Sequence, residues 1–307
     1  MVTTFAVIGD LSLDIAVAPS SARREGSDTP AEIRIGPGGQ GANVAVRLAR
    51  QGADTRLVTS LADDAAGRLL RDALHADRIR LTTLPAARST VVLVLLDDAG
   101  ERTMISDRQA LDPGPVSSGL AGAGWIHCSG YPLLDDRGGD ALAQLLGARA
   151  ANVRLSIAGG SVPPDPARLS QLRSRLATAA PDLLVISRDE AESMLATRPI
   201  RAAAAAGALQ ALAPVVIVTS GADGSAAAAG ELRLEVAAAA LPGPVLDATG
   251  SGDAYAAALL VELADLPTWP PPEGDLRAAM EKGSRLGALV ARVPGAQGRV
   301  AGELAVA

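Results

Sequence analysis

Short apolar runs alternate with helical patterns along most of this chain, and that alternation constrains the fold more than any other feature. The expected strands are FAVIGD, TRLVTSL, GWIHCSG, NVRLSIA, DLLVIS and PVVIVTS, and most of them carry an uninterrupted apolar run. Segments rich in Ala, Leu and Arg, such as GANVAVRLARQG and AAGRLLRDALHAD, predict helices between them. We therefore expect an α/β fold in which helices cover both faces of a mainly parallel sheet.

Two stretches interrupt this rhythm and predict a second, smaller sheet. Residues 12–36 contain no helical pattern, and AEIRI within them is expected to form an exposed strand. Residues 88–108 are expected to form a β-hairpin with its turn at 97–100. Together they suggest a sheet that projects from the main domain as a lid. Further along, the Ala-rich segment 201–213 predicts a helix, and 225–240 predicts weak strand and loop.

Composition excludes several classes of function. Aromatic residues make up 2% of the 307 residues, and the net charge is −6 without any run of Lys or Arg, so nucleic-acid binding is not expected. Cys128 is the only cysteine, which excludes an intramolecular disulfide and favours a cytoplasmic setting. Two histidines are too few for a histidine-based metal site. The apolar runs are too short for a signal peptide or a membrane span.

The first glycine-rich segment, RIGPGGQGANVAVRLARQG at 34–52, raises the possibility of a dinucleotide site. Gly36, Gly38 and Gly41 fit the G-x-G-x-x-G pattern of NAD-binding proteins. That pattern requires a long buried strand running directly into the first glycine. The sequence has only the short, charged AEIRI there, and the first strong buried strand ends at Gly9. An NAD-dependent oxidoreductase is therefore the least favoured of the functions that we consider.

The segment VLDATGSGDAYAAALLVEL at 245–263 carries the most informative chemistry. Small residues at 250–252 leave successive backbone N–H groups free at the start of a long apolar helix, and such groups bind anions. Asp253 lies inside this anion site, where a carboxylate opposes phosphate binding unless it has a chemical task. Accepting a proton from an attacking hydroxyl is such a task. The alternative is that Asp253 only caps the helix.

Both glycine-rich segments resemble the two signature regions of the ribokinase-like family, the PfkB-type carbohydrate kinases. Further motifs of that family follow in order: GDLSLDI at 9–15, GERTM at 100–104, SRDEAE at 187–192, VTSGADGS at 218–225 and PGAQG at 294–298. The resemblance implies a single domain, 1–307, with a ribokinase-like three-layer α/β sandwich, a mainly parallel central sheet and a small β-sheet lid. It also implies an ATP-dependent kinase that transfers the γ-phosphate to a hydroxyl of a small sugar or sugar-like molecule.

The resemblance assigns roles to the matching residues. Asp253 matches the general base, and the backbone amides of Gly250, Ser251, Gly252 and Asp253 match an anion hole. The acceptor-binding positions are Ser12, Asp14, Gly38, Gly39 and Asn43. The nucleotide and cofactor positions are Ser187, Glu190, Thr219, Gly221, Gly224, Asp247 and Thr249. Within that set, Glu190 is expected to organise Mg²⁺ through water, and Asp247 to lie at a candidate site for a monovalent cation such as K⁺.

Several positions depart from the family pattern. Ser187 stands where the family has the Asn of its N-x-x-E motif, and a hydroxyl replaces only part of the amide's hydrogen bonding. Arg299 stands where ribokinase has Ser, which puts potassium activation in doubt. Ala248 replaces a frequent Thr, and HCSGYP lacks an acid that ribokinase places near its sugar. Further differences from ribokinase or many relatives are Ser12, Gln40 and Ala158. Strict ribose specificity is therefore not expected.

Two more functions stay open at this point besides the oxidoreductase. One is a nucleoside kinase of the same fold, of the adenosine or pseudouridine type. The other is a protein that binds sugar or nucleotide without catalysis. Relatives pair their β lids edge to edge, and an exposed edge strand needs covering, so a homodimer through the lid is expected. The expected ligands are small molecules, with neither nucleic acid nor membrane as a partner.

Overall fold

A nine-stranded sheet forms the centre of the part of the chain that the structure describes. The structure is a computed structural model, and it describes residues 3–22, 25–96, 102–161, 165–241, 243–301 and 303. The strand order is β13-β12-β11-β10-β9-β8-β1-β4-β5. The parallel strands are β1 (Thr4–Ile8), β4 (Asp54–Leu61), β5 (Arg80–Pro85), β8 (Trp125–Cys128), β9 (Arg154–Ala158), β10 (Leu183–Ser187) and β11 (Val215–Thr219). An antiparallel hairpin, β12 (Ser225–Ala229) and β13 (Leu232–Val236), completes one edge.

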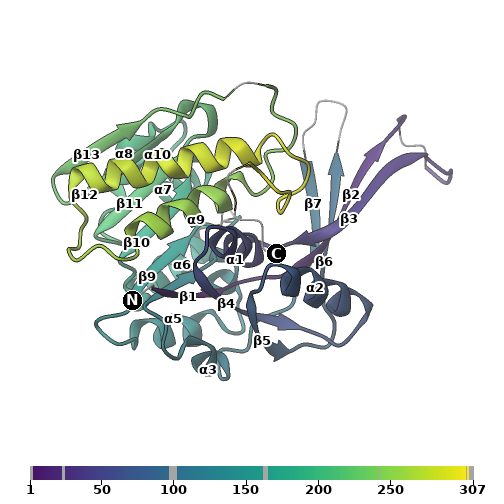
Figure 1. Cartoon of the computed structure of the whole chain (residues 1–307), viewed down its shortest axis with the longest axis horizontal. Helices are drawn as coiled ribbons and strands as arrows, with labels where there is room; N and C mark the ends of the chain where they lie inside the picture. Colours follow the sequence, from purple (N-terminus) through teal and green to yellow (C-terminus); the bar gives the residue numbers. More distant parts are fainter. Residues whose placement is uncertain are drawn as a thin grey trace.

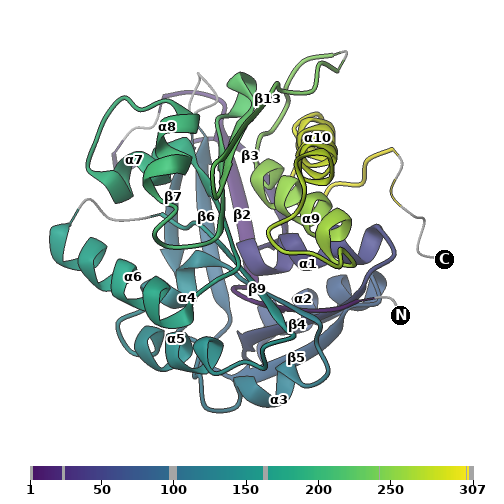
Figure 2. The same cartoon turned by 90° about the vertical axis from the view of Figure 1, so that its left-hand side faces the viewer.

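Helices cover both faces of this sheet, as the uninterrupted apolar strands predict (Figure 1). Neighbouring residues of β1 face opposite cores: Phe5 and Val7 pack in one, and Ala6 and Ile8 in the other. The first core contains helices α1 (Gln40–Arg50), α2 (Ala65–Ala76), α9 (Ser251–Leu263) and α10 (Glu273–Val290). The second core lies against α3 (Val116–Leu120), α4 (Gly130–Leu134), α5 (Gly139–Gly147), α6 (Pro166–Ala179), α7 (Arg188–Leu195) and α8 (Ala202–Ala208). Figure 2 shows the two helical layers on either side of the sheet.

A separate four-stranded sheet projects from the main body as a lid (Figure 1). Its strands lie in the order β3-β2-β6-β7. They are β2 (Ser12–Pro19), β3 (Ala31–Gly38), β6 (Thr90–Leu96) and β7 (Arg102–Asp107). The two predicted insertions therefore form one sheet, although the expected turn at 97–100 lies outside the described residues. Asp14 pairs with Gly36 of β3 and Val92 of β6, so all three side-chain positions lie on one face of the lid.

The Ala-rich segments differ from the sequence expectation. The helix predicted over 201–213 ends at Ala208, and turns lead from there to β11. The segment 225–240, expected to mix weak strand and loop, contains the regular hairpin β12–β13. Ala in β12 is buried against α8 and the neighbouring strands, and this packing outweighs its low strand propensity. Within the described ranges, no helix is long and apolar enough to cross a membrane.

Candidate active site

Asp253 lies in the first turn of α9, at the end of a tight glycine turn. Gly250 adopts φ 77°, and a Cβ atom there would lie 2.8 Å from the Cβ of Ala296, so only glycine fits. The first hydrogen bond of the helix runs from the Ala254 amide to the Gly250 carbonyl, at 2.8 Å. The amides of Gly252 and Asp253 precede that bond and point out of the helix end, while the Ser251 amide bonds the Ala248 carbonyl at 3.2 Å. The turn therefore presents donors beside a carboxylate.

A chain of amide side chains holds the Asp253 carboxyl. Asn43 Nδ2 donates to Asp253 Oδ2 at 2.8 Å, and Gln297 Nε2 donates to Asn43 Oδ1 at 3.0 Å. Removal from water raises the pKa of Asp253 to about 7, and the carboxylates of Asp10 and Glu190 act in the same direction. The Asn43 hydrogen bond and the Arg47 charge lower the pKa, but they only partly offset the burial. Asp253 is thus poised to exchange a proton near neutral pH.

Asp14 forms a second acidic position, on the lid strand β2. Ser12 Oγ donates to Asp14 Oδ1 at 2.6 Å, and burial raises the pKa of Asp14 to about 6. A Cβ atom at Gly38 would collide with the Asp14 carboxyl. Ser12, Asp14 and Gly38, predicted from distant sequence motifs, are therefore in direct contact at the base of the lid.

Close backbone packing explains why glycine is required at positions 39 and 41, but it does not explain Gly36. Gly39 adopts φ 96°, and a Cβ atom there would lie 2.5 Å from the Asp10 carbonyl oxygen. A Cβ atom at Gly41 would lie 2.5 Å from the Cα of Gly9. Around Gly36 the same test finds open space. The glycines therefore press the start of α1 onto the turn after β1, which brings Asn43 to Asp253, and the strand before them belongs to the lid rather than to the central sheet.

Two further residues at the base of the lid, Asp10 and Arg108, were not predicted from the sequence. Asp10 follows β1 directly, and its carboxylate forms an ion pair with Arg108 and accepts from the Gly41 amide at 3.4 Å. The Arg108 guanidinium also lies 3.7 Å from the centre of the Tyr131 ring. These residues line a cavity of about 250 Å³ beside the lid. Asp10 could have been predicted, because it follows a parallel strand and ligands bind at the carboxyl ends of such strands. No sequence pattern pointed to Arg108.

Ser187 and Glu190 interact with each other at the start of α7. Glu190 Oε2 accepts from the Ser187 amide at 2.8 Å and from its hydroxyl at 3.0 Å, and the Glu190 amide donates to Ser187 Oγ at 3.2 Å. This is a capping box, for which Ser is a favoured first residue. Burial raises the pKa of Glu190. Ser187 therefore has a structural task of its own, and it leaves Glu190 Oε1 for other contacts.

The predicted nucleotide residues lie on two further loops. Thr219 ends β11 and pairs in register with Ser187 of β10, so the two adjoin at the carboxyl edge of the sheet. Gly221 and Gly224 form the tight turn after β11, both with positive φ. Asp247 joins two other loops, because Oδ1 accepts from the Thr249 amide and hydroxyl at 3.0 and 2.6 Å, and Oδ2 accepts from the Gly295 amide at 2.9 Å.

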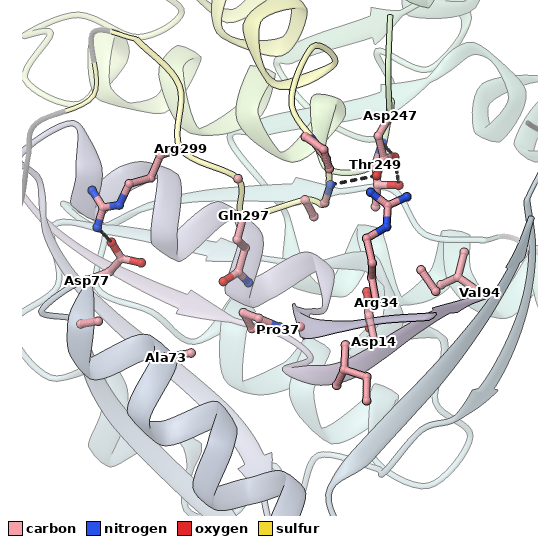
Figure 3. Close-up of a pocket in the computed structure, with 18 of the residues that line it drawn as sticks. Asp14, Arg34, Pro37, Ala73, Asp77, Val94, Asp247, Thr249, Gln297 and Arg299 are labelled. Carbon is pink, nitrogen blue, oxygen red and sulfur yellow. Dashed lines mark hydrogen bonds and ion pairs between the residues drawn. The ribbon is translucent and has the colours of Figure 1, made fainter. Parts of the chain in front are cut away.

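A cavity of about 660 Å³ opens between the lid, α2 and the loop 294–299 (Figure 3). Asp14, Asp247 and Thr249 line one part of it, and Arg299 lies at the other. Arg299, whose departure from the family pattern had put potassium activation in doubt, forms an ion pair with Asp77 at 3.2 Å. The physical reason is the nearby carboxylate of Asp77, which points toward it from the end of α2.

The described residues contain no group of three or more His, Cys, Asp or Glu side chains that could hold a metal ion by themselves. Mg²⁺ commonly keeps several waters and uses one or two carboxylates together with substrate phosphates. Glu190, with one oxygen held by its own capping box, fits that limited role. Cys128 is buried, and burial raises the pKa of its thiol to about 12, so it belongs to the core.

Comparison with known proteins gives a consistent result. A family model described as pfkB family carbohydrate kinase matches residues 2–301. A fructokinase of Klebsiella pneumoniae is 31% identical over 246 residues, which are 74% of this chain and 77% of that protein. The structure of a Thermotoga maritima ribokinase matches with a TM-score of 0.77 and 19% identity, over 96% of this chain and 95% of that one. A Vibrio cholerae fructokinase double mutant, solved with fructose, ADP and a potassium ion, matches with a TM-score of 0.78 and 23% identity, over 96% and 94%.

Proposed function

Because this chain belongs to the pfkB family of carbohydrate kinases and is thereby a phosphotransferase acting on a sugar hydroxyl, we propose that ATP is its phosphoryl donor and Asp253 its general base. Family membership sets aside the oxidoreductase and the non-catalytic binding protein. The observation that carries the proposal is the position of Asp253: a carboxyl with a raised pKa lies beside the outward-pointing amides of α9.

The residues at the start of α9 would carry out the phosphoryl transfer. The ionised Asp253 carboxylate accepts the proton of the acceptor hydroxyl as its oxygen attacks the γ-phosphorus of ATP. The new phosphorus–oxygen bond forms while the bond between the γ-phosphorus and the β–γ bridging oxygen breaks, and ADP leaves. The amides of Gly252 and Asp253 would stabilise the charge on the transferred group, and the turn at Gly250 and Ser251 would hold them at the start of the helix. The base and the anion site are thus supplied by one turn.

The acceptor is proposed to lie between the base and the lid. Asp14 can accept hydrogen bonds from two hydroxyls, and Ser12 orients one of its oxygens. Gly38 and Gly39 let the Asp14 carboxyl and the Asp10 backbone pack closely here, which places both aspartates at the base of the lid. Asn43, bonded to Asp253, would align the attacking hydroxyl. Asp10 and Arg108 add charged hydrogen-bonding groups on the other side of the lid base.

The nucleotide is proposed to lie along the carboxyl edge of β10 and β11. Thr219, Gly221 and Gly224 form a tight turn there, next to Ser187 and Glu190. Mg²⁺, bound with ATP, supplies charge neutralisation of the phosphates. Glu190 would hold waters of that ion through its free oxygen, while Ser187 keeps the carboxylate in place.

We expect a monovalent cation to bind where the Asp247 and Gly295 loops meet. Asp247 and Thr249 link these loops, and the amides of Leu246 and Asp247 both bond the Ala291 carbonyl, which joins this segment to the end of α10. Arg299 points away from this junction to Asp77, so it does not replace the cation. K⁺ should therefore raise kcat severalfold over Na⁺ at equal ionic strength. Equal rates in the two salts would refute a potassium site.

A nucleoside acceptor is the second candidate, and one feature of the large cavity favours it. The lining of the cavity also includes the apolar residues Pro37, Ala73 and Ala76, and Figure 3 shows Pro37 and Ala73 on the Asp77 side of the cavity. Its volume of about 660 Å³ lies within the usual range for small-molecule sites. A bare sugar leaves this apolar part unfilled, whereas the base of a riboside could occupy it.

The decisive experiment measures ADP release with MgATP across D-fructose, D-ribose, ribose 1-phosphate and adenosine, and identifies the products by mass spectrometry. The proposal expects one acceptor to gain a phosphate group. Asp253→Asn should then lower kcat by roughly 10²- to 10⁴-fold, because the general base is lost. The matched control is Asp275→Asn, which removes an exposed carboxylate in the first turn of α10. A fully active Asp253→Asn enzyme would contradict the assigned mechanism.

A further inference from the structure

Gln297 lies in the loop 294–299, inside the PGAQG motif, but the family resemblance assigned it no role. Its side chain enters the large cavity in Figure 3 and reaches toward the base of the lid. Gln297 Nε2 donates to Asn43 Oδ1 at 3.0 Å, while Asn43 Nδ2 donates to Asp253 Oδ2 at 2.8 Å. Asn43 thereby joins Gln297 to Asp253, across sequence separations of 254 and 210 residues.

The backbone beside Gln297 is held by two buried arginines of α1. Arg47 Nη2 donates to the Ala296 carbonyl at 2.6 Å, and Arg50 Nη1 donates to the Gln297 carbonyl at 2.7 Å. Arg47 has no exposed side-chain surface and pairs with Glu303 at 2.6 Å. Arg50 is likewise buried and pairs with Asp77. Charge-assisted bonds to successive carbonyls fix the loop, so Gln297 is aimed at Asn43 by a rigid support.

The direction of the Asn43 amide decides what Asp253 experiences. An asparagine side chain has a donor and an acceptor of nearly the same shape, so only its partners determine which one faces the carboxylate. In the observed orientation the N–H faces Asp253 and stabilises the ionised form. A reversed amide would place its oxygen against the carboxylate and destabilise that form. The carboxylate accepts from Asn43 Nδ2 and the Gln297 amide donates to Asn43 Oδ1, so this orientation leaves neither end of the Asn43 amide unpaired.

We propose that Gln297 is a positioning residue, which fixes the orientation of the Asn43 amide and through it the protonation of Asp253. The consequence for catalysis rests on the proposed function, in which Asp253 is the general base. The other charged groups that act on Asp253 are Asp10 after β1, Glu190 of α7 and Arg47 of α1. None of them contacts the Gln297 side chain through a hydrogen bond in the described residues, so replacing Gln297 tests the amide chain separately.

The test is a carboxyl NMR titration of the full-length, ligand-free protein labelled with ¹³C at aspartate, with Asp253 assigned by the loss of its signal in Asp253→Asn. Gln297→Met, which keeps length and removes the donor, should raise the Asp253 pKa by about 0.5 to 1 unit. Gln297→Glu should raise it further, because its carboxylate accepts from Asn43 Nδ2 and adds a negative charge. Gln210→Met is the matched control, since that side chain bonds the Gly230 carbonyl outside the site.

A double-mutant cycle makes the test specific to the Asn43 amide. In an Asn43→Ala background, Gln297→Met should leave the Asp253 pKa unchanged, since the group that transmits the effect is gone. An unchanged pKa in Gln297→Met alone, or an equal shift with and without Asn43, would overturn the proposal.

Kinetics with D-fructose as acceptor separates this proposal from the proposed function. In Gln297→Met, the apparent pKa of the acid limb of the kcat/KM profile should rise by the same amount as the Asp253 pKa measured by NMR. If Asp253 titrates as expected but phosphorylation does not follow its ionisation, the positioning role stands and Asp253 is not the base. If activity falls without any shift in either titration, Gln297 supports the loop only and the positioning role is wrong.

Discussion

At the scale of single residues, Asp253 shows how burial and hydrogen bonding set a proton affinity. Burial and two neighbouring carboxylates favour its neutral form, and the Asn43 amide and Arg47 favour its ionised form. The balance puts its pKa at about 7, where a base can be half ionised at neutral pH. Asp14, with one serine donor, reaches a pKa of about 6. Neither value follows from residue type, because both arise from groups brought together by the fold.

Activity is expected to fall as the pH drops below the pKa of Asp253. A protonated carboxyl cannot accept the hydroxyl proton, so kcat/KM should fall about tenfold per pH unit below about pH 7. The measurement is initial rate against pH with saturating MgATP. Asp275→Asn should leave the profile in place. A rate that stays constant down to pH 5 would exclude Asp253 as the group that must be ionised.

The same pKa predicts a stability cost of the site. The folded pKa of Asp253 lies above its unfolded value of about 3.8, so the stability associated with its protonated form is complete below pH 3.8 and is lost as pH rises through about 7. Asp253→Asn removes the ionisable group, and with it this loss of stability at high pH. The variant should exceed the wild type in unfolding free energy by about 1–3 kcal/mol at pH 8, and by less at pH 5. Urea unfolding at both pH values measures the difference, and a wild type that is more stable at pH 8 would disprove it.

At the scale of elements, α1 connects the two ends of the chain. Its N-terminus packs on the turn after β1 and carries Asn43, while Arg47 and Arg50 near its C-terminus bind the loop that contains Ala296 and Gln297. Arg50 also forms a bidentate ion pair with Asp77, at 2.9 and 2.8 Å, which links α1 to the end of α2. One helix therefore holds Asp253, the loop at one wall of the large cavity and the end of α2 in place.

Two substitutions, one of Asp77 and one of its partner Arg299, should show how much a buried ion pair stabilises the fold compared with a half-exposed one. Asp77→Asn leaves the buried guanidinium of Arg50 with Glu303, at 3.8 Å, as its carboxylate partner and should cost about 3 kcal/mol of unfolding free energy. Arg299→Ser removes a half-exposed partner of the same Asp77 and should cost less than about 1 kcal/mol. Chemical denaturation of both variants is the measurement. Equal losses would show that Arg50 does not depend on Asp77.

At the scale of the whole molecule, the lid leaves apolar side chains in water. Ile33 and Ile35 on the edge strand β3 are 58% and 63% exposed, and Ile105 on the opposite edge strand β7 is 57% exposed. Ile35, Ile15, Leu93 and Ile105 follow one another across the sheet in register, so they lie on a single face. Such a face on a projecting sheet favours association with another surface, and we propose that it is the lid of a second copy.

Replacing an isoleucine on each edge strand tests this dimer. Ile35→Lys combined with Ile105→Lys should shift the sedimentation coefficient from that of a dimer to that of a monomer, because charged groups oppose burial of the face. Leu69→Lys is the control, since Leu69 is 57% exposed on α2, outside the lid. A wild type that sediments as a monomer at all concentrations would refute the proposal.

The α/β class, the lid and the family could be predicted from the amino-acid sequence, because they depend on local patterns. Uninterrupted apolar runs predict strands buried on both faces, and the turn before α9 can be recognised from its glycines and Asp253. Only the tertiary structure revealed Asp10 with Arg108, the pairing of Arg299 with Asp77, and Gln297 behind Asn43. The physical reason is distance along the chain: these hydrogen bonds and ion pairs join residues that are 98, 222 and 254 positions apart. No local pattern records which distant partner a buried polar group will meet, because folding brings the elements together.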